Sequence, residues 1–341
     1  MSTSTAFLRT FGEYLLKKNL QHLIVHVTNR CNYRCEHCFI DFSRKQDLTL
    51  SQLQSLARQV GKLYWLDIAG GEPFLRKDLA EIVAAFDAQF VQIPSNGSLH
   101  DLIVDNLTRL KRLTRAKITI SLSLDGLPET HAKIRHNDKS WDDVWSAFEK
   151  IRSVGDVAIK INTVITRSNI DEIIPLMKFV RERSPDFHSI ILLRGTPLEP
   201  HVALPSVDEL RRIAPEIFTI LNTYDYGQNS MISRILRNYH RLLWKTSLRT
   251  IEQQRQVIPC YAGKFHMVVS SDGQVSSCEM LKPVGNINHG SFNTIKQSRA
   301  FKDQVKSIER GECHCTHNCA MLGSILFNPA NVIKLIKKPA I

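Results

Sequence analysis

The first residues that could do chemistry are three cysteines separated by three and then two residues. Cys31, Cys35 and Cys38 stand in the segment Cys-Asn-Tyr-Arg-Cys-Glu-His-Cys, directly after an apolar run. Three thiolates on one short loop can ligate three irons of a [4Fe–4S] cluster and leave the fourth iron open to another ligand. A zinc site completed by His37 or by a distant cysteine is the alternative interpretation of the same residues.

A second group of cysteines lies near the C-terminal end of the sequence. Its first two members are Cys260 and Cys278, which are separated by twelve residues, Gly273 and four more residues. Thiols in this number again indicate a metal centre, and a structural zinc site is one alternative because His314 and His317 stand close by. The five cysteines are Cys260, Cys278, Cys313, Cys315 and Cys319.

The elements that must position the first cysteines follow from the apolar pattern of the first 205 residues. Short apolar runs rich in β-branched residues alternate with helical patterns, at the spacing of repeated strand–helix units. Six strands are predicted, at residues 23–27, 64–69, 91–94, 117–124, 159–165 and 189–193. Helices are predicted near residues 1–20, 50–56, 78–86, 102–113, 141–154 and 171–183.

This alternation predicts an α/β fold, a partial (β/α)6 parallel barrel built from residues 1–205. Its ligands should sit at the carboxyl ends of the strands. Residues 206–257 are expected to form a basic helical connector. Two short strands flank the turn Ser-Asp-Gly that ends at Gly273, so residues 258–341 are expected to form a small cysteine-rich α+β module with a tail.

Polar residues stand at the predicted ends of successive strands. The second strand ends on Gly70-Gly71-Glu72-Pro73, in which the glycines permit close backbone approach and Glu72 supplies an acceptor. An ordinary strand-ending turn is the alternative for this segment. The other candidate ligand-binding residues are Ser95, Asn96, Ser121, Ser123, Asp125, Arg135, Asn162 and Arg194.

The cysteine loop and the Gly-Gly-Glu-Pro segment one unit later resemble the radical S-adenosylmethionine (SAM) superfamily, across the whole strand–helix portion. The resemblance implies a [4Fe–4S] cluster at Cys31, Cys35 and Cys38, whose open iron binds the amino and carboxylate groups of SAM. Electron transfer then cleaves SAM to methionine and a 5′-deoxyadenosyl radical, which abstracts hydrogen from the substrate. His37 occupies a position where the family has an aromatic residue near the adenine, and histidine is a planar substitute.

The same resemblance implies roles for the residues at the strand ends. Gly70-Gly71-Glu72-Pro73 is similar to the motif that meets the SAM amino group. Arg135 resembles an arginine that pairs with the SAM carboxylate, for which a guanidinium fork is suited, and a solvated surface arginine is the competing interpretation. Asn162 and Arg194 are candidates by their position on or after a strand. The residues similar to the ribose and carboxylate contacts are Ser95, Asn96, Ser121, Ser123 and Asp125.

The C-terminal cysteines resemble the shortened SPASM, or twitch, extension of the same superfamily. There a hairpin that contains a glycine brings two cysteines to an auxiliary iron–sulfur cluster, as Cys260 and Cys278 would do here. The single residue between Cys313 and Cys315 is fewer than the usual two, and the cysteines are too few for two auxiliary clusters. We therefore expect one second cluster, with its remaining ligands open among Cys313, Cys315 and Cys319.

Composition and net charge limit the classes of protein to which this chain can belong. The absence of an export signal predicts that the eight cysteines are free thiols rather than disulfides. No stretch approaches the roughly 18 unbroken apolar residues of a membrane-spanning helix, so a cytoplasmic location is expected. The net charge of +12 favours acidic partners or reflects a surface with excess lysine and arginine.

These observations predict a radical SAM enzyme with oxidoreductase-like chemistry on a small metabolite, sugar or peptide. Its expected partners are a substrate, which could be acidic, and an electron donor such as a flavodoxin or ferredoxin. The tail after Cys319 could touch a membrane surface or pack against the module.

A zinc-stabilised binding module is one alternative to this function. A basic nucleic-acid-modifying or nucleic-acid-binding protein is another, disfavoured because Tyr239 and Trp244 are the only aromatic residues within residues 234–255.

Overall fold

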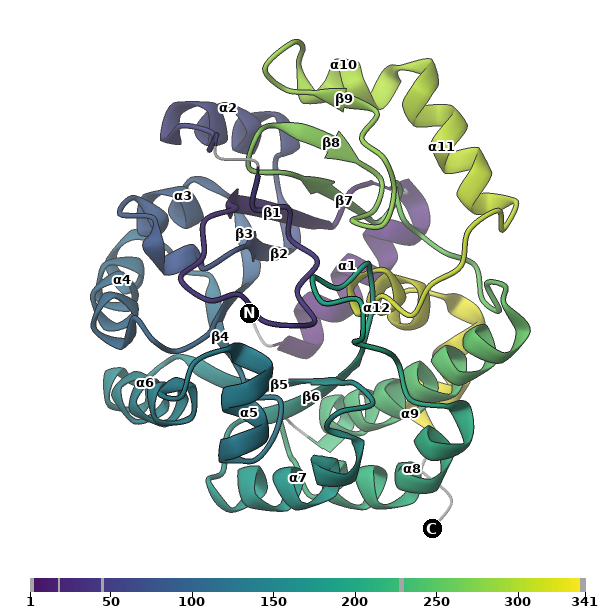
Figure 1. Cartoon of the computed structure of the whole chain (residues 1–341). Coiled ribbons are helices and arrows are strands. Elements are labelled where there is room, and N and C mark those ends of the chain that lie inside the picture. The colour runs from purple at the N-terminus through teal and green to yellow at the C-terminus, as the bar shows by residue number, and fades with distance from the viewer. Residues whose placement is uncertain (1–2, 18, 44–45, 227–229, 338–341) are drawn as a thin grey trace.

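The computed structural model describes residues 3–17, 19–43, 46–226 and 230–337 (Figure 1). Its first six strands run parallel, and each is hydrogen-bonded to the next in chain order. β6 and β1 do not pair with one another, so the barrel is open. The predicted partial (β/α)6 barrel is therefore confirmed. The strands are β1 (His22–Thr28), β2 (Leu63–Gly70), β3 (Ala88–Ser95), β4 (Lys117–Ser123), β5 (Ala158–Ile165) and β6 (Phe187–Leu192).

Helices follow the strands and form the outer layer in Figure 1. Thr49 caps α2 in a capping box with Gln52. One short helix, α5, has no counterpart among the helices expected from the sequence. The helices are α1 (Thr3–Lys17), α2 (Leu50–Val60), α3 (Leu79–Ala85), α4 (His100–Leu113), α5 (Pro128–Arg135), α6 (Ser140–Val154), α7 (Ile173–Glu182), α8 (Val207–Leu221) and α9 (Ser230–Gln253), with the 3-10 turns η1 (Pro73–Leu75) and η2 (Ile170–Glu172).

The C-terminal segment begins with the expected hairpin, because β7 and β8 pair antiparallel around a turn in which Gly273 has φ +87°. β7 also pairs in parallel with β1, so the hairpin extends the barrel sheet instead of standing apart from it. The elements here are β7 (His266–Val269), β8 (Gln274–Ser276), β9 (Gly285–Asn286), α10 (Phe292–Gln297), α11 (Arg299–Glu309), α12 (Asn318–Leu326), η3 (Pro329–Asn331) and α13 (Val332–Ile336).

The tail packs on the rest of the chain. Phe327, after α12, is fully buried against Phe265 and Tyr14. Ile333 and Ile336 remain exposed. Within the described ranges no single helix has the length and apolarity to cross a membrane, and the apolar pair formed by α12 and the segment Pro329–Ile336 is bent by 77°.

Candidate functional site

The loop with Cys31 leaves β1 beside the Gly-Gly-Glu-Pro segment, and the two glycines make that approach possible. A Cβ on Gly70 would lie 2.0 Å from the backbone oxygen of Thr28, and a Cβ on Gly71 would lie 2.1 Å from that of Arg30. The Gly71 and Glu72 amides donate to these same two oxygens. The glycines therefore join the end of β2 to the start of the cysteine loop.

Hydrogen bonds from several elements hold the rest of this loop. The Glu36 amide donates to Ile134 in α5, and the Leu198 amide after β6 donates to the oxygen of Cys38. The Tyr33 hydroxyl donates to Asp143 in α6 at 2.7 Å. Because the loop is tied to α5, α6 and the segment after β6, its three thiols are fixed relative to the barrel.

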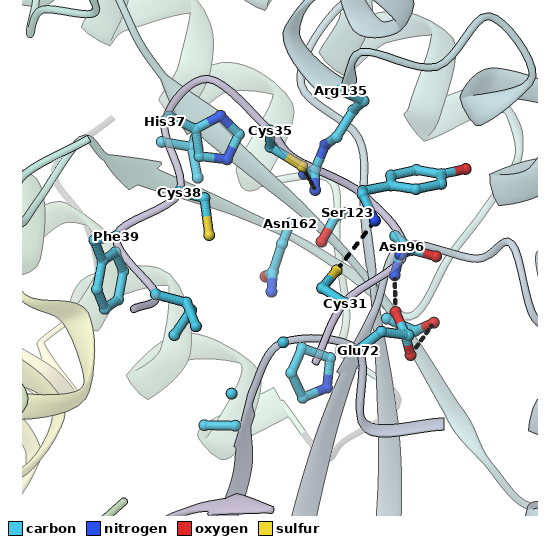
Figure 2. A pocket seen from close by; sticks show the side chains of 18 of the residues that line it. Cys31, Cys35, His37, Cys38, Phe39, Glu72, Asn96, Ser123, Arg135 and Asn162 are labelled. Atoms are coloured by element: carbon cyan, nitrogen blue, oxygen red, sulfur yellow. Dashed lines mark hydrogen bonds between the residues drawn. The ribbon is translucent and has the colours of Figure 1, made fainter. Parts of the chain in front are cut away.

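The cysteine loop covers a cavity of about 230 Å³ at the carboxyl ends of the barrel strands. Figure 2 shows the sulfur atoms of Cys31, Cys35 and Cys38 around a common space. Pro73, Ser121 and Asp125, which the sequence also suggested, are not among the lining residues that the structure describes. The predicted ligand-binding residues that line the cavity are Gly70, Gly71, Glu72, Ser95, Asn96, Ser123, Arg135, Asn162 and Arg194.

Glu72 is buried, and its carboxylate joins β2 to the loop after β3. It accepts from the Asn96 amide at 2.8 Å, from the Ser95 hydroxyl at 3.1 Å and from the Phe74 amide at 3.2 Å. Burial raises the pKa of Glu72 to about 7, although these hydrogen bonds oppose the shift. The residue thus combines a structural role with a place on the cavity wall.

Replacing Glu72 with alanine is expected to weaken SAM binding by on the order of tenfold or more, since a charge-assisted hydrogen bond contributes about 1.5–3 kcal/mol. Iron content should be unchanged because Glu72 holds no metal. Calorimetry on the reconstituted protein measures the affinity, and exposed Glu129→Ala is the matched control. In the wild type SAM affinity should rise from pH 6 to pH 8, as Glu72 loses its proton near pH 7. Equal affinity in wild type and Glu72→Ala removes Glu72 from the SAM site.

Arg135 is engaged by groups of this chain. Its guanidinium forms an ion pair with Asp125, whose side chain is fully buried, and Nη1 donates to Sγ of Cys35 at 3.4 Å. Asp125 also accepts from the Val164 amide at 2.9 Å. Burial would raise the pKa of Asp125, but Arg135 and His37 hold it below its usual value. Asp125 therefore positions Arg135 at the cavity wall beside Cys35.

Asp125→Asn is expected to lower the free energy of unfolding by about 3–5 kcal/mol, because it leaves the Arg135 guanidinium buried without a counter-charge. The folded-state pKa of Asp125 is depressed, so the stability it provides is present above its ordinary pKa and is lost as pH falls through the folded value. Urea unfolding of the wild type and variant at pH 7 measures the loss. The exposed Asp142→Asn should change stability little, and an equally small effect at Asp125 contradicts this role.

Three of the C-terminal cysteines pack together at the end of the β7–β8 hairpin. Cys260 and Cys313 contact the small buried cluster of Cys278, Ala262 and Ile308. Burial raises the pKa of the Cys260 thiol to about 11, and nearby Cys315 and Cys313 raise it further. Burial also raises the pKa of the Cys278 thiol, and nearby Cys315 and Cys260 raise it further. Four thiols, those of Cys260, Cys278, Cys313 and Cys315, thus lie in one neighbourhood.

Cys319 lies apart from these four thiols. It is in the first turn of α12, and its Sγ donates to Asp67 of β2 at 3.5 Å. Burial raises the pKa of this thiol, and the charges of Asp67 and Glu279 raise it further. Cys319 therefore faces the barrel strands, whereas the other four C-terminal cysteines gather at the hairpin.

Among the described cavity residues that the sequence did not suggest, Glu279 is the one with a charged side chain. Glu279 follows Cys278 directly and lines the same cavity as Cys31, Cys35 and Cys38. His26 of β1 contacts its carboxylate at 2.8 Å, and His317 contacts the other oxygen. Burial would raise the pKa of Glu279, but these two histidines hold it well below its usual value. The signal available in the sequence was its adjacency to a hairpin cysteine.

Both thiol groups fit iron–sulfur clusters by their donor chemistry. Burial raises the pKa of the Cys31 thiol to about 11 and of Cys278 well above its usual value, so metal binding must displace their protons. Among the described residues, no three histidine, cysteine, aspartate or glutamate side chains converge on one point as the ligands of a single metal ion would. A cluster does not need this convergence, because each cysteine binds a different iron.

Comparison with known protein families identifies the class of protein to which this arrangement is similar. Residues 25–180 match the family model of the radical SAM superfamily, and residues 260–320 match SPASM, an iron-sulfur cluster-binding domain. The chain therefore contains a domain that matches the radical SAM superfamily. It carries a SPASM module, which implies auxiliary iron–sulfur binding in addition to the [4Fe–4S] cluster with SAM that the first domain implies.

Curated relatives include an S-adenosylmethionine-dependent nucleotide dehydratase of Selenomonas ruminantium, 34% identical over 160 residues, which are 43% of this chain and 57% of that protein. A GTP 3',8-cyclase of Marinobacter nauticus is 28% identical over 211 residues, 58% of this chain and 62% of that protein. The chain thus spans about three fifths of the length of these two relatives.

Two solved structures share the fold. The structure of anSMEcpe with bound AdoMet has a TM-score of 0.60 at 17% identity, covering 84% of this chain and 83% of that one. Streptococcus suis SuiB bound to precursor peptide SuiA has a TM-score of 0.63 at 16% identity, covering 88% of this chain and 70% of that one. None of these findings supports the nucleic-acid-binding alternative.

Proposed function

We propose that this protein is a radical SAM enzyme that cleaves SAM reductively and abstracts hydrogen from an organic substrate. The observation that carries the proposal is the cavity, in which three fixed thiols face the Gly-Gly-Glu segment. When bound at Cys31, Cys35 and Cys38, a [4Fe–4S] cluster with SAM supplies the 5′-deoxyadenosyl radical. An external electron donor, such as a flavodoxin or ferredoxin, provides the electron.

The residues around the cavity have separate tasks in this proposal. Glu72, Ser95 and Asn96 shape the wall that receives the amino and ribose groups of SAM, and Ser123 and Asn162 continue that wall along β4 and β5. Arg135, fixed by Asp125, places positive charge beside Cys35. Its Nη1 donates to Sγ of Cys35, the atom that would bind iron.

The second cluster is proposed to bind Cys260, Cys278, Cys313 and Cys315, since these four thiols gather at the hairpin. Glu279 links this site to the cavity, because it follows Cys278 in the chain and lines the cavity itself. A carboxylate in this position can accept a hydrogen bond from a bound substrate. The auxiliary site thereby takes part in positioning the substrate or in its oxidation.

Anaerobic reconstitution tests the function directly. The reconstituted protein should absorb in the visible range as an iron–sulfur protein, and it should form 5′-deoxyadenosine from SAM when a strong reductant is added. A colourless protein that contains zinc, or an iron-loaded protein that forms no 5′-deoxyadenosine, contradicts the proposal.

A further inference from the structure

Arg194 presents a cation to the cavity without an anion to match it. It lies directly after β6, lines the cavity and is partly buried. Its Nε is buried and has no hydrogen-bond partner. Among the described residues no carboxylate forms an ion pair with it, whereas Arg135 is paired with Asp125. Because a buried charge is costly when unpaired, a ligand that brings an anion would be favoured here.

The position of the Arg194 side chain is fixed by its neighbours. Its guanidinium carbon lies 5.2 Å from the centroid of the Phe39 ring, and Phe39 follows Cys38. Gly195 has φ +73°, and a Cβ there would lie 3.0 Å from Cβ of Phe39, so glycine allows this close packing. The guanidinium therefore has a defined place relative to Cys38.

The charged groups near Arg194 do not compensate its charge. Burial lowers the pKa of Lys160 to about 8, and the charge of Arg194 acts in the same direction. Two of the described acids line the cavity, Glu72 and Glu279. The carboxylate of Glu279 is engaged by His26 and His317, and that of Glu72 accepts from Ser95 and Asn96. Neither carboxylate is paired with Arg194, so its guanidinium is open to an anionic ligand.

Arg194 lies on the side of the cavity that holds Cys38, away from Glu72 and Asn96 (Figure 2). Glu72 and Asn96 come from β2 and the loop after β3, and Figure 2 shows them across the cavity from Phe39, against which Arg194 packs. The positive charge of Arg194 acts to lower the pKa values of Cys315 and His317 in the C-terminal module. Arg194 therefore stands on the side of the cavity that faces the auxiliary site.

We propose that Arg194 binds an anionic group, a phosphate or a carboxylate, of the substrate, on the wall of the cavity that faces the auxiliary site. The inference rests on the proposed function and gives the substrate a chemical class. A guanidinium fork binds both anions through two parallel hydrogen bonds. The carboxylate of SAM is the other source of this chemistry, and the experiment separates the two sources.

The test uses the reconstituted holoenzyme saturated with SAM, with inorganic pyrophosphate and succinate as probes of the two anion chemistries. Calorimetry should detect binding of at least one probe. Arg194→Gln should weaken that binding by about tenfold or more, and Arg194→Lys should retain part of it, because lysine keeps the charge but not the fork. Arg212→Gln, which changes an exposed arginine on α8, is the control for the loss of one positive charge and should bind the probe as the wild type does.

Three outcomes overturn the inference: neither probe binds, the probe binds Arg194→Gln as tightly as the wild type, or the probe binds only when SAM is absent. The last result would assign Arg194 to the SAM carboxylate. Circular dichroism of each variant checks that it is folded. Iron content and 5′-deoxyadenosine formation by the same wild-type preparation test the proposed function separately, so an enzyme that cleaves SAM but binds neither anion contradicts only this inference.

Discussion

Replacing Cys31, Cys35 and Cys38 together with alanine is expected to abolish 5′-deoxyadenosine formation. The same change should remove roughly half of the iron if two four-iron clusters are present. The physical reason is that these three thiols face one space, and the loop that carries them is tied to α5, α6 and the segment after β6. No other cysteine lies in the same loop that could replace them.

The measurement is iron content per chain together with product analysis by chromatography after anaerobic reduction. Glu72→Ala serves as the comparison, because it alters the cavity wall without removing a thiol and should keep its iron. If the triple variant still forms 5′-deoxyadenosine, the assignment of the SAM cluster to this loop is wrong.

The sequence predicted the barrel and the cysteine loop because both depend on local patterns. Alternating apolar runs and helical segments specify repeated strand–helix units, and the structure has all six predicted strands. Cysteines three and two residues apart must share one loop. The two glycines after β2 were also informative, since side chains at Gly70 and Gly71 would collide with the backbone of Thr28 and Arg30.

The partners of the charged cavity residues could not be predicted in this way. Arg135 was expected to pair with a ligand, but its guanidinium meets Asp125 at the end of β4. That contact depends on α5, a short helix without a clear apolar period. The environment of Glu279 likewise depends on His26 and His317, which are 253 and 38 residues away in the sequence. Such contacts follow from tertiary packing and not from spacing.

The position of the β7–β8 hairpin in the fold also depends on tertiary packing. Its turn was evident from Ser-Asp-Gly, but the pairing of β7 with β1 joins residues more than 200 positions apart. This pairing brings Glu279 to the cavity and sets Cys319 against β2. The sequence could count five C-terminal cysteines, but it could not divide them into a group of four and one that stands apart.

That division leads to the second expected result of large effect. Replacing any one of Cys260, Cys278, Cys313 and Cys315 with alanine should lower the iron content, while the SAM cluster and SAM cleavage without substrate are retained. Turnover of the true substrate should fail, because the first site generates the radical and the second positions the substrate or accepts an electron. A structural zinc site predicts unchanged iron, lost zinc and reduced stability instead.

Cys319→Ala is the matched control, because it also removes a C-terminal thiol, but one that contacts Asp67 of β2. It should keep the full iron content, since its loss leaves the four thiols at the hairpin intact. Iron and zinc analysis of all five single variants decides between the possible ligand sets. Loss of iron in Cys319→Ala at the level of Cys278→Ala would place Cys319 among the ligands. Unchanged iron in both Cys260→Ala and Cys278→Ala would refute the auxiliary cluster, because these hairpin thiols are common to every arrangement of the second site that the sequence allows.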